Sequence, residues 1–214
     1  MKIRFCLYFL PKRIEYDNRN GLVRYSTYSR TDCDKKMSAE SIPANMEERP
    51  ETTKVQHSWV LWYFDPRNKD WSLTNYKKIA DLCTPQQLWS IIGAIPKEAW
   101  ECGYFFFMRR GFRPIWEVPE NENGGSWSKK VTTKEIAEIA TDLMVHCVAG
   151  HEGILLQKQD TLVGFSTSPK GDYNIVKIWN NNTSCNNAKT FLNGKMQKFK
   201  VTEDVVYTAH KSRR

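Results

Sequence analysis

The sequence predicts an α+β fold built on a large antiparallel β-sheet. Three observations support this: short aromatic or β-branched runs recur along the chain, polar turns separate several of them, and a few segments have helical periodicity. Short polar turns join neighbouring strands in antiparallel order. Because strands and helices do not alternate regularly, the helices are expected to gather on one face of the sheet.

The strands are predicted from six apolar runs. Residues 59–64 are apolar on both faces and end at an Asp-Pro pair, which is typical of a central strand covered on each side. A second run spans Tyr104 to Met108. The remaining strands are expected at residues 154–157, 161–165, 175–179 and 205–208.

Three segments have the features of helices. The first, at about residues 84–93, begins Thr-Pro-Gln-Gln, which supplies a capping threonine, a proline at the first helical position and a glutamine that completes a capping box. The second begins at Thr132 in a similar arrangement and carries an apolar stripe that ends before Gly150. A weaker third helix is expected at about residues 185–192.

The composition divides the chain into two regions. Residues 1–56 are rich in charged and small polar residues and have almost no apolar periodicity, so they are predicted to be a disordered N-terminal arm. Residues 57–214 are predicted to be the folded domain. The apolar run at residues 5–10 is too short for a secretory signal, and no stretch approaches the ~20 apolar residues of a membrane span.

Charge and residue content indicate the class of ligand. The net charge of +8 favours an anionic partner such as nucleic acid or an acidic membrane surface. The aromatic content of 13% exceeds what core filling usually requires, and aromatic rings also stack on nucleobases. Six scattered cysteines without a C-x-x-C pair predict reduced thiols and neither a metal site nor a disulfide framework. No phosphate-binding glycine loop, nucleophile elbow or paired-carboxylate signature is present, so neither an enzyme nor a cofactor is predicted.

Two loop segments are the leading candidates for a binding site. Asp70-Trp71 and Trp116-Glu117 each place a large aromatic just beyond a predicted strand, where core packing does not demand one. On spacing alone a structural alternative stays open, in which both tryptophans close the end of a barrel.

Six motifs follow one another along the chain: His57-x-Trp59-x-Leu61-Trp62-Tyr63-Phe64, Asp70-Trp71, Leu88-Trp89, Pro114-x-Trp116-Glu117, Gly124-Gly125-x-Trp127 and Ile178-Trp179. This ordered set resembles the eukaryotic translation initiation factor 4E family, the cytoplasmic proteins that bind the cap of messenger RNA. The resemblance covers about residues 57–210, and seven of the eight tryptophans match the family pattern, with Trp100 as the exception. It implies that residues 57–214 are a cap-binding domain.

The resemblance implies a strongly curved antiparallel sheet of about eight strands, with three helices on its convex face and the cap in the concave mouth. Trp71 and Trp116 would stack on the two faces of 7-methylguanine, whose positive charge adds cation–π attraction to stacking. Glu117 would accept hydrogen bonds from the N1–H and N2–H groups of guanine. Trp179 is implied to contact the N7-methyl group, with core packing an equal alternative. Three further tryptophans are implied to be structural: Trp59, Trp62 and Trp127.

Phosphate binding is where the chain departs from the family pattern. Ser168 occupies the place of the family's arginine, which leaves Lys170 and Lys177 as phosphate ligands. A lysine binds phosphate as a point charge without a bidentate fork, so weaker binding of the triphosphate is expected. The basic residues 211–214 are a further candidate and are equally compatible with a solvated tail.

A second surface is implied on the first helix. Trp89 matches the family's tryptophan that packs against a Tyr-x-x-x-x-Leu-apolar helix of an initiation factor 4G type scaffold or a repressor. A buried core tryptophan is the alternative. With Gly150 as anchor, His146 falls where the family has leucine, which points to altered partner specificity.

The sequence therefore predicts a monomeric, cytoplasmic protein that binds capped mRNA, not a membrane, and acts in translation initiation or its regulation. A competing hypothesis is a general single-stranded RNA-binding protein that uses exposed aromatics without cap specificity.

Overall fold

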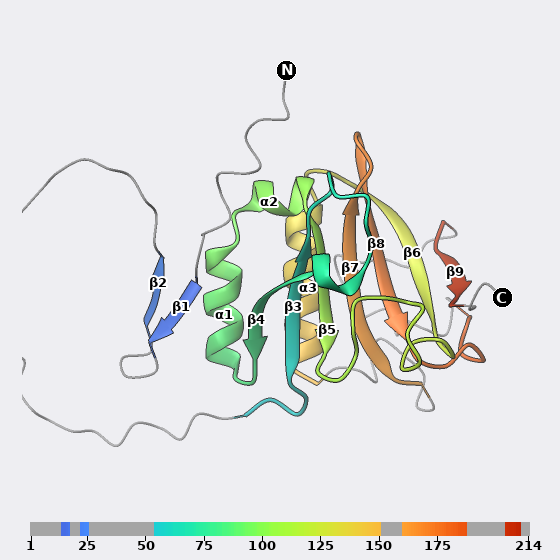
Figure 1. Ribbon diagram of the computed structural model, residues 1–214, viewed down its shortest axis with the longest axis horizontal. Coiled ribbons are helices and arrows are strands. Elements are labelled where there is room, and N and C mark those ends of the chain that lie inside the picture. The colour runs from blue at the N-terminus through green and yellow to red at the C-terminus, as the bar shows by residue number, and fades with distance from the viewer. Residues whose placement is uncertain (1–13, 18–21, 26–53, 151–159, 188–203, 211–214) are drawn as a thin grey trace, which may run out of the picture. The chain divides into compact units, whose positions relative to one another are not determined.

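The chain, seen in the computed structural model of Figure 1, divides into two compact units. One unit spans residues 11–53 and contains an antiparallel pair of strands, β1 (Ile14–Asp17) and β2 (Leu22–Tyr25). The assignment of residues 1–56 to a disordered arm stays a prediction. All other described elements belong to the second unit. The structure describes residues 14–17, 22–25, 54–150, 160–187 and 204–210.

Seven strands of the second unit form one sheet in the order β4-β3-β5-β7-β8-β6-β9 (Figure 1). All neighbouring strands are antiparallel, as predicted. Among the described residues this sheet thus has seven strands, where about eight were expected. The strands are β3 (Trp59–Phe64), β4 (Lys77–Leu82), β5 (Tyr104–Arg109), β6 (Gly125–Thr132), β7 (Leu162–Pro169), β8 (Tyr173–Asn180) and β9 (Val206–Ala209).

Five of these strands coincide with predicted runs, whereas β4 and β6 were not predicted. Both are rich in lysine, which interrupts the apolar alternation that marks a strand. In β6 the alternation survives only at Trp127 and Val131, which are buried in the core. The strand predicted at residues 154–157 lies outside the described residues.

Three helices accompany the sheet: α1 (Pro85–Ala94), α2 (Lys97–Cys102) and α3 (Ile136–Val148). The capping box predicted for α1 is confirmed, because Thr84 Oγ1 accepts a hydrogen bond from Gln87 N (3.3 Å) and Gln87 Oε1 accepts one from Thr84 N (3.1 Å). The sequence therefore encodes the start of α1 locally.

The other helices differ from their predicted bounds. α3 begins at Ile136, four residues later than predicted, because β6 extends to Thr132 and a turn follows it. Thr132 Oγ1 donates to the carboxylate of Glu135 (2.7 Å), so this pair holds the turn and does not cap the helix. α2 was not predicted. Of the helix predicted at 185–192, residues 185–187 are not helical and the rest lies outside the described residues.

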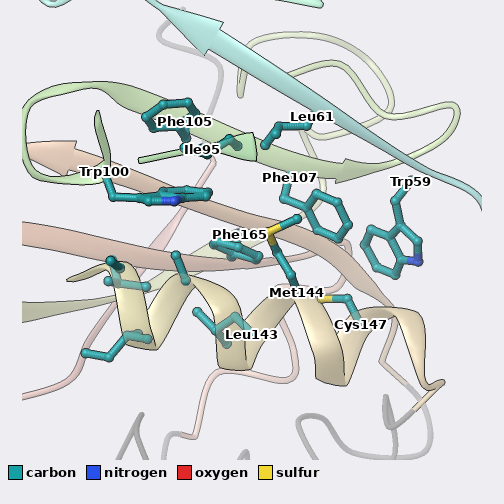
Figure 2. Close-up of a cluster of buried hydrophobic side chains, with 14 of the residues drawn as sticks. Trp59, Leu61, Ile95, Trp100, Phe105, Phe107, Leu143, Met144, Cys147 and Phe165 are labelled. Atoms are coloured by element: carbon teal, nitrogen blue, oxygen red, sulfur yellow. The ribbon is translucent and has the colours of Figure 1, made fainter. Parts of the chain in front are cut away.

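The helices cover one face of the sheet with the main hydrophobic core. Figure 2 shows the side chain of Met144 of α3 pointing toward Phe107 and Phe165 of the sheet. Trp59 stacks on Phe107 with 5.2 Å between ring centroids, and Trp100 of α2 packs at 4.4 Å on Phe105 on the same face. The tryptophan outside the family pattern, Trp100, is therefore a core residue.

The opposite face of the sheet carries a second, smaller cluster, which we call the open-face cluster. Its buried members come from β3, β5, β7, β8 and the residue just before β4, and the half-buried Trp62 and Trp116 pack against it. Among the described residues, none of the three α-helices contributes a side chain to this cluster. The buried members are Phe64, Tyr76, Phe106, Met108, Val163 and Trp179.

The described cysteines differ from one another. Cys83, Cys147 and Cys185 are free thiols. Cys102 is disulfide-bonded, so the expectation of reduced thiols is wrong at this position. None of the helices in the described ranges has the length and apolar character needed to cross a bilayer.

Candidate ligand-binding site

A cavity of about 360 Å³ opens on the open-face cluster. Its walls come from the loops after β3 and β5 and from strands β5, β7 and β8. Six of the seven predicted site residues line it, although they lie up to 108 positions apart in the sequence: Trp71, Trp116, Glu117, Lys170, Lys177 and Trp179.

The loop that carries Trp71 is held by the side chain before it. The carboxylate of Asp70 accepts hydrogen bonds from Ser72 N (3.0 Å), Ser72 Oγ (3.0 Å) and Asn75 Nδ2 (2.7 Å). These hydrogen bonds, the backbone one first, lower the pKa of Asp70, so the loop keeps its anchor at neutral pH. Trp71 stacks on Phe64 with centroids 4.2 Å apart and planes 6° apart, yet its side chain remains 49% exposed. One ring face is supported by Phe64, and much of the ring is left accessible.

Further aromatic rings surround Trp71. The Tyr104 ring meets Trp71 edge-on at 5.3 Å, and Tyr76 lies 6.5 Å away at 55°. Burial raises the pKa of Tyr76, and the negative charge of Glu117 adds to this rise. The carboxylate of Glu117 therefore acts electrostatically on the same cavity that Trp71 lines.

The segment with Trp116 is held by a buried amide. Asn121, only 1% exposed, donates through Nδ2 to the backbone carbonyls of Arg113 (2.8 Å) and Ile115 (2.6 Å). The guanidinium of Arg113 also forms a two-pronged ion pair with Glu120 (2.5 and 2.8 Å), which lowers the pKa of that carboxyl to about 2. These contacts fix the backbone on both sides of Pro114, in the segment that leads directly to Trp116.

Trp179 is 5% exposed and belongs to the open-face cluster while also lining the cavity. Its Nε1 donates to Ser166 Oγ (3.0 Å) on the neighbouring strand, and the ring of His210 meets it edge-on at 4.7 Å. Core packing and contact with a ligand are thus compatible for this residue.

Two lysines border the aromatic part of the cavity. Lys170 is exposed, with Nζ 5.8 Å from the centroid of the Tyr104 ring, whereas Lys177 is half-buried. Burial, and secondarily the charge of Lys170, lower the pKa of Lys177. Within the described ranges neither lysine forms an ion pair with a carboxylate. Ser168 also lines the cavity.

The seventh predicted residue, Trp89, lies on α1 and not at the cavity. Its side chain is 59% exposed, while Leu88 and Ile91 of the same helix are buried, so it is not the core residue of the alternative interpretation. His146 lies on α3, with Nε2 3.6 Å from Asp142 Oδ1.

Sequence reasoning missed several residues of the site. Tyr104 and Phe106 alternate along β5 with the core residues of that strand, and this period of two already indicates that they face the other side. Tyr76 and Asn121 lie in loops without periodicity, and His210 is 89 positions from Asn121, so these three residues had no such signal. In the described part of the chain, no three His, Cys, Asp or Glu side chains converge as metal ligands.

The fold and the cavity together define a class of protein: an antiparallel sheet that carries helices on one face and a ligand-binding cavity on the other. The cavity is lined by aromatic side chains and bordered by lysines. Such a cavity suits a flat ring attached to an anionic group, because rings stack on indoles and ammonium groups attract phosphate.

Comparisons with known proteins give the family. A family model described as eukaryotic initiation factor 4E matches residues 54–214, and the chain belongs to this family of translation initiation factors. Eukaryotic translation initiation factor 4E-1 of Caenorhabditis elegans is 29% identical over 157 residues, which cover 68% of this chain and 71% of that protein. Eukaryotic translation initiation factor 4E-2 of Schizosaccharomyces pombe is 31% identical over 173 residues, 74% of this chain and 68% of that protein.

A solved structure supports the fold. The C. elegans eIF4E-3 chain, in a complex with the 4E-binding protein Mextli and a cap analog, superposes with a TM-score of 0.60 at 20% identity. The match covers 74% of this chain and 94% of that chain. The antiparallel sheet and its helices are therefore those of the family.

Proposed function

We propose that this protein binds the 7-methylguanosine cap of mRNA and acts in translation initiation or its regulation. One observation carries the proposal: Trp71, Trp116 and Glu117, from two separate loops, line a single cavity. A methylated guanine between two indoles gains stacking and cation–π attraction, with stacking worth about 1 to 3 kcal/mol per base. Family membership and the solved relative with a cap analog support this assignment.

Stacking does not distinguish guanine from adenine, so the base must be read at its edge. Glu117 is exposed at the cavity, and an ionised carboxylate accepts both N1–H and N2–H of guanine in a charge-assisted pair. Trp179 is proposed to contact the N7-methyl group from the cavity wall. Adenine has no such pair of donors, so the carboxylate supplies the preference for guanine.

The phosphates of the cap are proposed to bind Lys170 and Lys177. Two ammonium groups that have no carboxylate partner among the described residues border the cavity, and their mutual repulsion favours an anion between them. Because neither group forms a bidentate fork, this part of the site contributes mainly charge.

A partner is proposed to bind at Trp89. An exposed tryptophan on a helix is a typical anchor for an amphipathic partner helix. The chemistry fits a scaffold of the initiation factor 4G type or a repressor with a Tyr-x-x-x-x-Leu-apolar helix. The eIF4E-3 relative was solved with a 4E-binding protein, which is consistent with this type of partner.

Tryptophan fluorescence quenching tests the cap assignment directly. We expect 7-methylguanosine triphosphate to bind far more tightly than guanosine triphosphate, and the preference to disappear in Trp116→Ala. Trp89→Ala is the matched control, because it removes an equally large ring outside the cavity and leaves the preference intact. Equal affinity for the two nucleotides would contradict cap recognition and favour general single-stranded RNA binding.

A further inference from the structure

The residue that follows the last described strand contacts a residue of the cavity wall. β9 pairs with β6 at the edge of the sheet, with Ala209 opposite Gly125. The next residue, His210, donates its backbone N–H to Gly124 O (2.8 Å) and is only 7% exposed. A buried histidine next to the loop of Trp116 therefore comes from the far end of the described chain.

The imidazole of His210 contacts both halves of the site. Its Nδ1 is 3.1 Å from the backbone oxygen of Asn121, so Nδ1 carries the proton and donates it to that carbonyl. The ring edge meets Trp179 at 4.7 Å and 61°. His210 thus touches one cavity residue directly and, through Asn121, the segment that carries Trp116.

The buried side chain of Asn121 forms hydrogen bonds to other described residues through its amide donors and not through its amide oxygen. Its Nδ2 donates to the two carbonyls that flank Pro114, while its Oδ1 has no hydrogen-bond partner within the described part of the chain. Burying an unpaired polar atom costs free energy, so the two donor bonds must offset this cost. Asn121 is therefore suited to hold the backbone that leads into Trp116 in place.

We propose that His210 and Asn121 are positioning residues that fix the Trp116 segment relative to Trp179, and that cap affinity depends on this connection. The proposal rests on the proposed function. A ring that stacks on a base must be held within fractions of an ångström, and second-layer hydrogen bonds are the usual means.

The protonation state of His210 is consistent with this role. Burial lowers its pKa, and so does the charge of Lys177, while the Asn121 hydrogen bond opposes the shift. The ring contacts the Asn121 carbonyl and the Trp179 indole, and the Lys177 ammonium acts on it through its charge. The neutral form with the proton on Nδ1 is the one that the contacts favour at neutral pH.

Affinity for 7-methylguanosine diphosphate, measured by calorimetry at a temperature where every variant is folded, tests the proposal. His210→Phe keeps the ring against Trp179 but removes the donor, and we expect it to weaken binding about 3- to 10-fold, as for one lost hydrogen bond. Asn121→Asp should weaken binding at least as much. Val206→Thr is the matched control, since this exposed β9 residue has no contact with the cavity.

A double-mutant cycle separates positioning from a merely structural role. If His210 acts through Trp116, His210→Phe should change affinity little in the Trp116→Ala background. A stabilising role alone would lower the melting temperature and leave the affinity of the folded protein unchanged, which would overturn the proposal. Parent protein without any methyl preference would instead overturn the proposed function, so the two failures are distinguishable.

Discussion

The two faces of the sheet use the same strands for different purposes. Phe105 and Phe107 of β5 point to the helices and are buried in the main core, whereas Tyr104 and Phe106, which alternate with them in the sequence, line the cavity. Strand side chains alternate between faces, so one strand serves both. The difference lies in what covers each face: three helices on one side, and two loops with tryptophans on the other. Aromatic residues should therefore govern stability on the first face and binding on the second.

The largest expected effect tests the helix-covered face. Phe107 is fully buried between Trp59 and Phe165, so Phe107→Ala leaves a void and should lower the free energy of unfolding by about 3 to 5 kcal/mol. Urea unfolding followed by circular dichroism measures the change. The folded fraction should keep its ratio of affinities for methylated and unmethylated nucleotide. A loss of that ratio would show that the two faces are not separable.

The next effect concerns the outer surface of the helices. Trp89→Ala should reduce binding of a synthetic Tyr-x-x-x-x-Leu-apolar peptide by about 2 kcal/mol or more, as for a central aromatic anchor. Nucleotide affinity and stability should change little, because the side chain is exposed. Fluorescence anisotropy of a labelled peptide measures the effect, with the partly exposed Ser90→Ala on the same helix as control. Unchanged peptide affinity would place the partner elsewhere.

A smaller effect is expected on the open face. Trp71→Ala removes a half-exposed ring stacked on Phe64 and should weaken binding of 7-methylguanosine nucleotide by about 1 to 3 kcal/mol. Stability should fall much less than in Phe107→Ala. Trp71→Phe, which keeps a smaller ring, should recover part of the affinity. If Trp71→Ala destabilised the protein as much as the core variant without affecting binding, the tryptophan would be structural.

Much of the fold and of the candidate site was predictable from the sequence, and the elements and residues that were missed have physical causes. The start of α1 was found because its capping box is local, whereas the Thr132 and Glu135 pair fits a turn as well as a cap. α2, with six residues, is too short to show periodicity. The tryptophans in loops indicated the cavity, because core packing does not require large aromatic side chains at those positions. Asn121 and His210 were not predicted, because 89 positions separate them in the sequence.

The smallest effect concerns charge at the rim of the open face. Lys170 is exposed and contributes through its ammonium group, so Lys170→Ala should weaken binding of 7-methylguanosine triphosphate modestly. Its dependence on salt is more informative: the slope of log affinity against log salt should become shallower by up to about 0.7 to 0.9 for one lost phosphate contact. Binding of 7-methylguanosine, which lacks phosphate, is the control and should not change.

Lys177→Met extends this test to the half-buried lysine, because it keeps an unbranched side chain of similar length and removes only the charge. Both lysine variants should flatten the salt slope for the triphosphate while leaving the nucleoside unaffected. Slopes equal to that of the parent protein in both variants would remove the lysines from the phosphate site. The open face would then bind its ligand through the aromatic rings and Glu117 alone, and the cap phosphates would need ligands outside the cavity.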